Sequence, residues 1–142
     1  MAEALARTIA VDAMGGDKGP SAVVEGVGMA LSSQGGASLK IVLVGQEEVL
    51  RPLLKKAKLE NDPRVSLLHA AEVIGMDEKP IKSIKAKRDS SLVRAVELVK
   101  DGTCKAAVSC GNTGSLMACG TIKLRMMPGV ERPALAAVWP SQ

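Results

Sequence analysis

The chain has 142 residues, of which 46% are hydrophobic and 24% charged, and its formal net charge at pH 7 is +4. This composition excludes an intrinsically disordered chain, and the length suits one globular domain. With one Trp and no Tyr or Phe, the chain lacks the aromatic platforms on which single-stranded nucleic acids stack, so we expect no nucleic-acid partner.

In chain order, short β-branched runs alternate with segments whose apolar residues lie three and four apart. The runs predict strands, and the other segments predict amphipathic helices. The expected strands are residues 8–13, 39–45, 64–70, 105–110 and 134–139, and the expected helices are residues 20–33, 47–58, 91–101 and 113–126.

Strands that alternate with helices favour a parallel sheet covered on both faces. We therefore predict a single α/β domain over residues 1–142, built as a three-layer αβα sandwich with a mainly parallel sheet. In such sheets, ligands bind beyond the carboxyl ends of the strands. The motifs that follow the predicted strands are therefore the candidate sites.

The sequence VDAMGGDKGP, residues 11–20, joins the first predicted strand to its helix. Asp12 ends the strand, and Gly15 and Gly16 allow a tight turn into the helix. Free N–H groups and the helix dipole at such a turn attract anions. Asp12, Gly15 and Gly16 are therefore candidate residues for binding phosphate or substrate, although Asp12 and Asp17 would repel a phosphate unless a cation or a hydroxyl group intervenes. The same residues also suit a plain tight turn. Both interpretations stay open.

The sequence VSCGNTGSLMACG, residues 108–120, follows the fourth predicted strand. The start of its predicted helix offers backbone N–H groups at glycines, a side chain that can cap the helix, and hydroxyl groups, but no negative charge. This set suits a phosphate or a carboxylate, and its amides could also stabilise an acyl oxyanion. An ordinary capped helix with a glycine-rich start is the alternative. The candidate binding residues are Gly111, Asn112, Thr113, Gly114 and Ser115.

The three cysteines and the single histidine suggest little chemistry of their own. The cysteines show no CxxC spacing, which predicts neither a disulfide framework nor a zinc site. Cys110 lies near a predicted helix start, where a thiol can become nucleophilic, but the only histidine is His69 and we expect it to be structural. We expect Cys104 and Cys119 to be small core residues.

The connection at residues 71–90 is longer and more highly charged than a plain turn. Its basic residues fall three apart and would form one cationic stripe on a helix, with Ile81 and Ile84 facing inward. A solvated helix face is the alternative. The stripe consists of Lys79, Lys82, Lys85 and Arg88. We further expect a second group to complete an anion site with the Asn112 loop: Lys87, Arg88, Ser90 and Ser91.

Four motifs in this order resemble one protein family over the chain from about Thr8 onward. VDAMGGDKGP, KRDSSLVRAVELVKDG, VSCGNTGSLMACG and VERPALAAVWP are similar to sequences of the phosphate acyltransferases of bacterial phospholipid synthesis, the acyl-ACP:phosphate transacylases. The resemblance implies that inorganic phosphate attacks the thioester of a fatty acyl group on acyl carrier protein (ACP), which gives acyl phosphate. It implies no metal or nucleotide cofactor.

The resemblance also implies a fold like that of the isocitrate and isopropylmalate dehydrogenases and of phosphotransacetylase. It implies a cytoplasmic homodimer with peripheral membrane contact. On this basis Asn112 is our candidate catalytic residue, and Lys79, Lys82 and Lys85 are expected to dock the acidic carrier protein. Cys110 and Ser115 stand where relatives usually have alanine, so we expect neither to be essential.

Members of this family are more than twice as long as this chain, so we expect an N-terminal portion that is inefficient alone. In the family, the second half supplies the dimer contacts, the membrane contact and part of the active site. Two other functions stay open: phosphotransacetylase-like transfer from a CoA thioester, and a non-catalytic module that binds phosphate or ACP. A nicotinamide dehydrogenase is disfavoured because the chain has no GxGxxG motif.

Overall fold

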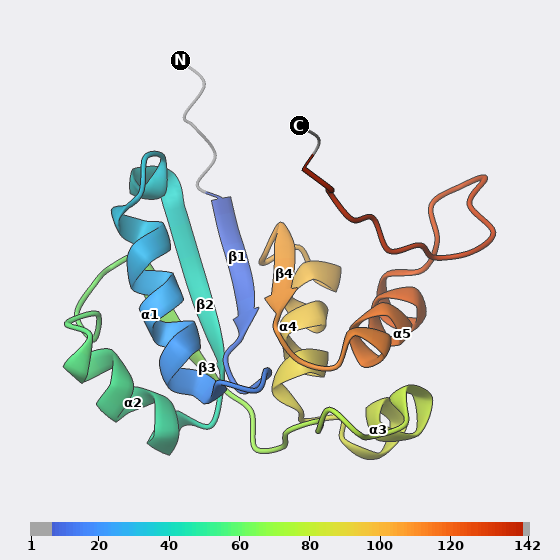
Figure 1. Ribbon diagram of the computed structural model, residues 1–142, viewed down its shortest axis with the longest axis horizontal. Coiled ribbons are helices and arrows are strands. Elements are labelled where there is room, and N and C mark those ends of the chain that lie inside the picture. The colour runs from blue at the N-terminus through green and yellow to red at the C-terminus, as the bar shows by residue number, and fades with distance from the viewer. Residues whose placement is uncertain (1–6, 141–142) are drawn as a thin grey trace.

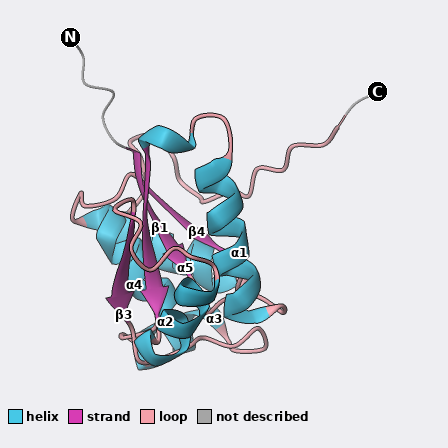
Figure 2. Ribbon diagram, turned by 90° about the vertical axis from the view of Figure 1, so that its left-hand side faces the viewer, coloured by secondary structure: helices cyan, strands magenta, loops and turns pink. Residues whose placement is uncertain are grey.

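The computed structural model describes residues 7–140. Its centre is a sheet of four parallel strands in the spatial order β3-β2-β1-β4 (Figure 1). All four strands point the same way, so their carboxyl ends lie together (Figure 2). The strands are β1 (Arg7–Asp12), β2 (Leu39–Gly45), β3 (Val65–His69) and β4 (Ala106–Ser109).

Helices cover both faces of this sheet, as predicted for a three-layer sandwich. Figure 1 shows α1 and α2 on one side and α4, α5 and α3 on the other. The helices are α1 (Gly19–Ser32), α2 (Glu47–Lys56), α3 (Pro80–Ala86), α4 (Ser91–Lys100) and α5 (Thr113–Leu124). A short 3₁₀ turn, Gly36–Ser38, precedes β2. Among the described residues, no helix is long and apolar enough to cross a membrane.

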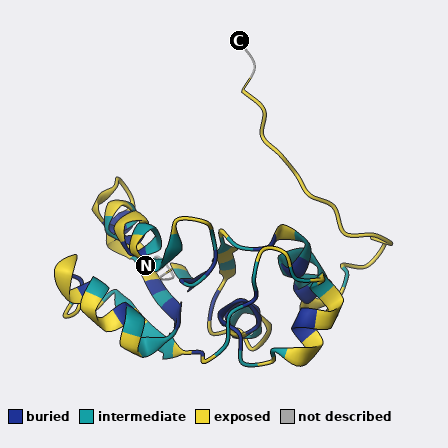
Figure 3. Ribbon diagram, turned by 60° about the horizontal axis from the view of Figure 1, so that its bottom comes forward, coloured by how far each residue is buried: buried dark blue, intermediate teal, exposed yellow. Residues whose placement is uncertain are grey.

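The core lies between the sheet and each helical layer (Figure 3). On the α1 side, aliphatic residues of β1 and β2 pack against α1 and α2, with Leu43 and Leu50 fully buried. On the α4 side, Val93 and Val96 of α4 pack against Cys119 of α5. Since the chain has almost no aromatic residues, aliphatic side chains fill both layers.

The predicted strand at residues 134–139 is wrong. This segment is extended but pairs with no strand, and the side chains of Val138 and Trp139 are 99% and 87% exposed. The chain turns at Pro128 and Gly129 after α5 and does not return to the edge of β4. A β-branched run becomes a strand only where a neighbour supplies hydrogen bonds and a packed face.

Arg64 connects the start of β3 to the end of α1. Its guanidinium donates to the carboxylate of Asp62 at 2.8 and 3.0 Å and to the carbonyl oxygens of Leu31 and Gly36 at 3.0 and 3.2 Å. The hydrogen bonds from Arg64 lower the pKa of Asp62 to about 2. The ionised Asp62 carboxylate therefore fixes the position of Arg64, which links the start of β3 to the end of α1 and the segment after it.

We expect Asp62→Asn to lower the free energy of unfolding near neutral pH. The pKa of Asp62 falls from 3.8 to about 2 on folding, so its contribution is complete above the higher value and is lost as the pH falls through the lower one. In urea unfolding followed by circular dichroism, the free energy of unfolding of the parent should approach that of the variant as the pH falls from 3.8 to about 2. Asp77→Asn is the control, because Asp77 is exposed and has no ion pair within residues 7–140. A constant difference across the window would contradict the prediction.

Candidate functional site

Two glycine-rich turns meet at the carboxyl ends of β1 and β4. The two strands are paired so that Asp12 lies opposite Ser109. The Ser109 hydroxyl donates to Asp12 Oδ2 at 2.7 Å and accepts from the Gly111 N–H at 3.1 Å. Asp12 is 3% exposed, and its Oδ1 accepts from the Met14 N–H at 3.2 Å. The Asp12 carboxylate therefore joins both turns.

The contact between the turns requires glycine on the β1 side. A Cβ atom added to Gly15 would lie 2.7 Å from Asp12 Oδ2 and 2.8 Å from the Gly111 nitrogen. Gly16 has a φ of +99°, and its Cβ would lie 3.0 Å from that of Cys110. The structure thus brings together the two motifs that the sequence left as separate candidates.

Asn112 organises the start of α5. Its Oδ1 accepts from the Ser115 N–H at 3.0 Å, which makes Asn112 the N-cap of the helix. Its Nδ2 donates to the carbonyl oxygens of Gly75, Met76 and Glu78 at 3.3, 3.0 and 3.0 Å. With 8% of its surface exposed, Asn112 holds the loop at residues 75–78 against α5.

The free donors of the α5 start are backbone groups. Within the described part of the chain, the N–H groups of Thr113 and Gly114 make no hydrogen bond. Thr113 is exposed, whereas the Ser115 hydroxyl is buried and has no partner among the described residues. A Cβ on Gly114 would lie 3.0 Å from Pro80 Cγ. An anion at this helix start would therefore meet Thr113 and the backbone first.

Lys87 is engaged in an ion pair with Glu78. The Glu78 carboxylate also accepts from the Gly75 N–H at 2.9 Å, and Lys87 Nζ donates to the Val73 carbonyl at 2.8 Å. The Lys87 ammonium, and then the Gly75 N–H, lower the pKa of Glu78. An anion that bound Lys87 would have to compete with this carboxylate.

The other members of the predicted Lys87 group lie at the start of α4. Ser90 is buried and caps α4 by accepting from the Val93 N–H at 3.3 Å. Ser91 is 1% exposed, and its N–H donates to the Glu72 carbonyl at 3.1 Å. Arg88 is exposed. The two serines are thus buried at the start of α4, whereas the side chain of Arg88 is accessible to an anion from solvent.

The basic stripe is shorter than predicted. Helix α3 ends at Ala86, so Arg88 lies beyond it. The three remaining lysines are exposed: Lys79 is the N-cap of α3, and Lys82 and Lys85 lie on the helix. Ile84 is buried as predicted, but Ile81 is 57% exposed, so the expectation that it faces inward is wrong. Between α3 and α5 lies a hollow of about 800 Å³. Pro80, Ile81 and Met117 line it, together with Lys79, Lys82 and Lys85.

The cysteines and His69 form no catalytic pair within residues 7–140. His69 Nδ1 accepts from the Glu47 N–H at 3.2 Å at the start of α2, a structural role as expected. Cys104 and Cys119 are buried core residues as predicted, and burial raises the pKa of both thiols, to about 11 for Cys119. Cys110 is exposed beside the glycine turns. No group of three His, Cys, Asp or Glu residues in this range could hold a metal ion.

Comparison with known proteins places this chain in a family. A family model described as "Fatty acid synthesis protein" matches residues 7–142. The chain is 46% identical over 134 residues to a phosphate acyltransferase of Idiomarina loihiensis, covering 94% of this chain and 39% of that protein. It is 44% identical over 137 residues to a phosphate acyltransferase of Pseudomonas putida, covering 96% and 40%.

A phosphate acyltransferase of Methylococcus capsulatus is 47% identical over 134 residues, covering 94% of this chain and 39% of the relative. The chain thus spans about two fifths of the length of these relatives. The matched segment includes both glycine turns, the Asn112 cap and the lysines around α3. The chain therefore belongs to the family of fatty acid synthesis proteins, and the resemblance of its four motifs to the phosphate acyltransferases is confirmed.

Proposed function

We propose that this chain carries the phosphate-binding part of an acyltransferase that makes acyl phosphate from long-chain acyl-ACP and inorganic phosphate. The observation that carries the proposal is the meeting of the two glycine turns at the carboxyl ends of β1 and β4. In parallel α/β sheets this edge is where ligands bind. The names of the relatives supply the acyl and phosphate substrates.

In the proposed reaction, a phosphate oxygen attacks the carbonyl carbon of the thioester. The carbon–sulfur bond then breaks, and the proton released by phosphate ends on the carrier thiolate. The N–H groups of Thr113 and Gly114, together with the positive end of the α5 dipole, would hold the phosphate or stabilise the oxyanion of the intermediate. Since a thiolate leaves readily, no His-centred triad is needed.

The buried hydrogen bonds around the turns support this role by making the site rigid. Asp12, Ser109 and Gly111 connect one turn to the other, and Asn112 connects α5 to residues 75–78. Donors held in place before the substrate arrives need not be reordered during the reaction. Asn112 stays our candidate catalytic residue, although its amide is engaged in the fold.

To test the proposal, acyl phosphate is trapped with hydroxylamine. The protein is a chimera in which residues 7–142 replace the matching part of the Pseudomonas putida relative, and the native relative is the positive control. We expect hydroxamate from long-chain acyl-ACP only when phosphate is present. Equal turnover of acyl-CoA would favour the phosphotransacetylase-like alternative. A folded chimera that binds phosphate without turnover would favour the binding module.

We further propose that the exposed lysines around α3 bind ACP. Lys79, Lys82 and Lys85 rim a hollow with an apolar floor, and ACP is acidic, so opposite charges would orient the encounter. We also propose, from the family resemblance, that the complete enzyme is a cytoplasmic homodimer with peripheral membrane contact.

Replacing Lys79, Lys82 and Lys85 together with Glu should raise the KM for acyl-ACP by about tenfold or more at low salt, with little change in kcat, because charge reversal repels an acidic partner. The effect should shrink with added salt. The measurement is the hydroxamate assay in the chimera as a function of acyl-ACP and salt. The matched control reverses three exposed lysines around the end of α2: Lys55, Lys56 and Lys58. Equal effects of the two triple variants would contradict a docking role.

A further inference from the structure

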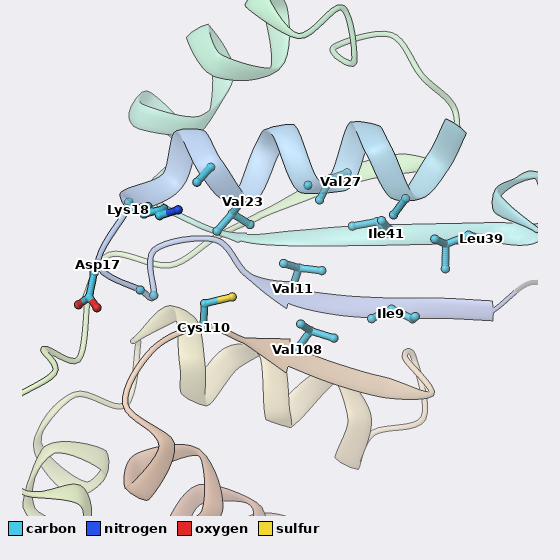
Figure 4. Close-up of a pocket in the computed structure, with 16 residues that line it drawn as sticks. Ile9, Val11, Asp17, Lys18, Val23, Val27, Leu39, Ile41, Val108 and Cys110 are labelled. Atoms are coloured by element: carbon cyan, nitrogen blue, oxygen red, sulfur yellow. The ribbon is translucent and has the colours of Figure 1, made fainter. Parts of the chain in front are cut away.

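An apolar groove runs between α1 and the sheet. Its volume is about 490 Å³, within the usual range of ligand pockets. Figure 4 shows aliphatic side chains of α1, β1, β2 and β4 pointing into it. The lining includes Ile9, Val11, Val23, Val27, Ile41 and Val108. Val108 on the edge strand β4 is 46% exposed, so this end of the sheet is only partly covered by α1.

One end of the groove coincides with the candidate site. Gly15, Gly16 and Cys110 belong both to the groove lining and to the meeting point of the two glycine turns. Asp17 and Lys18 line the same end, and within residues 7–140 they are the only charged residues that line the groove. The groove is therefore polar where it reaches the site and aliphatic along the sheet.

Helix α1 leaves room along the groove. Ala22, Gly26 and Ala30 line it at intervals of four residues, so small residues form a row on this side of the helix. A Cβ atom on Gly26 would meet no heavy atom within 4 Å. From Gly19 to Ala30, the helix axis extends by about 17 Å at the usual rise per residue. The space is long and narrow, and it follows the helix.

We propose that this groove binds the acyl chain, with the thioester carbonyl at the Gly15 and Cys110 end. This inference rests on the proposed function and extends it to the position of the substrate's apolar part. A hydrocarbon chain has no polar groups, so it can fill this aliphatic space without leaving any donor or acceptor unpaired. Each buried methylene should favour binding by about fourfold.

Cys110 offers a direct test in this chain because it is exposed at the end of the groove, whereas Cys104 and Cys119 are buried. Methyl, butyl and decyl methanethiosulfonates form mixed disulfides with a thiol and release methanesulfinate. Labelling of Cys110 is followed by mass spectrometry, with each reagent below its micelle concentration. We expect the decyl reagent to react more than about tenfold faster than the methyl one, because the groove holds its tail.

Two variants of α1 show whether the groove causes this preference. Gly26→Leu would place a side chain in the groove and would favour the helix, since glycine is a poor helix former. We expect it to bring the ratio of decyl to methyl rates close to that of a free thiol. The matched control is Glu25→Leu, which adds the same side chain at an exposed neighbour outside the lining. It should keep the parent ratio.

The inference is overturned if the parent chain shows no decyl preference, or if Gly26→Leu keeps it. Slow labelling by all three reagents would instead indicate that a second copy or another segment fills the groove, and this too overturns the inference. The hydroxamate assay separates the two proposals. A decyl preference without any acyl transfer would support acyl-chain binding in the groove and contradict the proposed enzymatic function. Acyl transfer without a decyl preference would support the enzymatic function and contradict acyl-chain binding in the groove.

Discussion

Replacing Gly15 with alanine should lower acyl transfer in the chimera by about a hundredfold, the usual cost of moving a catalytic group by about 1 Å. The added Cβ would lie 2.7 Å from Asp12 Oδ2 and 2.8 Å from the Gly111 nitrogen. The second of these is a backbone atom, so the two turns must move apart. Such overpacking should also lower the free energy of unfolding by about 1–3 kcal/mol.

Hydroxamate formation and urea unfolding measure the two effects of Gly15→Ala separately. The matched control is Gly26→Ala, where nothing lies within 4 Å of the added Cβ. In a helix, that change should raise the free energy of unfolding by about 0.5–1 kcal/mol. If Gly15→Ala kept the parent's activity and stability, the meeting of the two turns would not matter for function.

Asn112→Ala should lower the free energy of unfolding by about 2–3 kcal/mol. Loss of the helix cap costs about 1 kcal/mol, and loss of the two amide N–H donors, which the carbonyls of Gly75, Met76 and Glu78 share, costs about 1 kcal/mol each. Asn112→Asp keeps the acceptor for the Ser115 N–H but loses the donors. It also places a carboxylate oxygen against the carbonyl oxygens of Gly75, Met76 and Glu78, which repel it, so this variant should be no more stable than the alanine variant.

These variants also show whether Asn112 takes part in the chemistry. Unfolding is measured with urea, and kcat with the hydroxamate assay at a temperature where every variant is folded. A catalytic Asn112 predicts a large fall in kcat for both variants under that condition. If kcat stays near that of the parent while stability falls, Asn112 positions the loop at residues 75–78 and is no catalytic residue.

Most of the fold follows from the spacing of apolar residues. All four strands and four of the five helices lie where the sequence predicts them, because each segment buries one face against a neighbour. The segment at residues 134–139 is similarly apolar but pairs with no strand among the described residues, so its composition alone does not predict its structure. Helix α3 carries part of the basic stripe, but it ends at Ala86 and is shorter than the spacing from Lys79 to Arg88 suggests.

The site could be predicted in outline but not in its contacts. The rule that ligands bind beyond the carboxyl ends of parallel strands indicates both glycine turns as separate candidates, but it does not predict that the turns touch each other. It could not show that Asn112 donates to residues 75–78 or that Lys87 pairs with Glu78, because both depend on the path of a long connection. The groove was missed for a related reason: periodicity identifies the buried side of α1, not the part of the sheet that α1 leaves open.

The place of β1 in the sheet affects how the protein folds. β1 pairs with β2, which follows closely in sequence, but also with β4, and the hydrogen bond from Ser109 to Asp12 joins residues 97 positions apart. Contacts between distant residues form slowly because a long loop must close first. During synthesis, strands β1 to β3 can therefore pair before β4 has been made. The two glycine turns then meet late in folding, so a chain that binds ligand there has already paired the four strands described above.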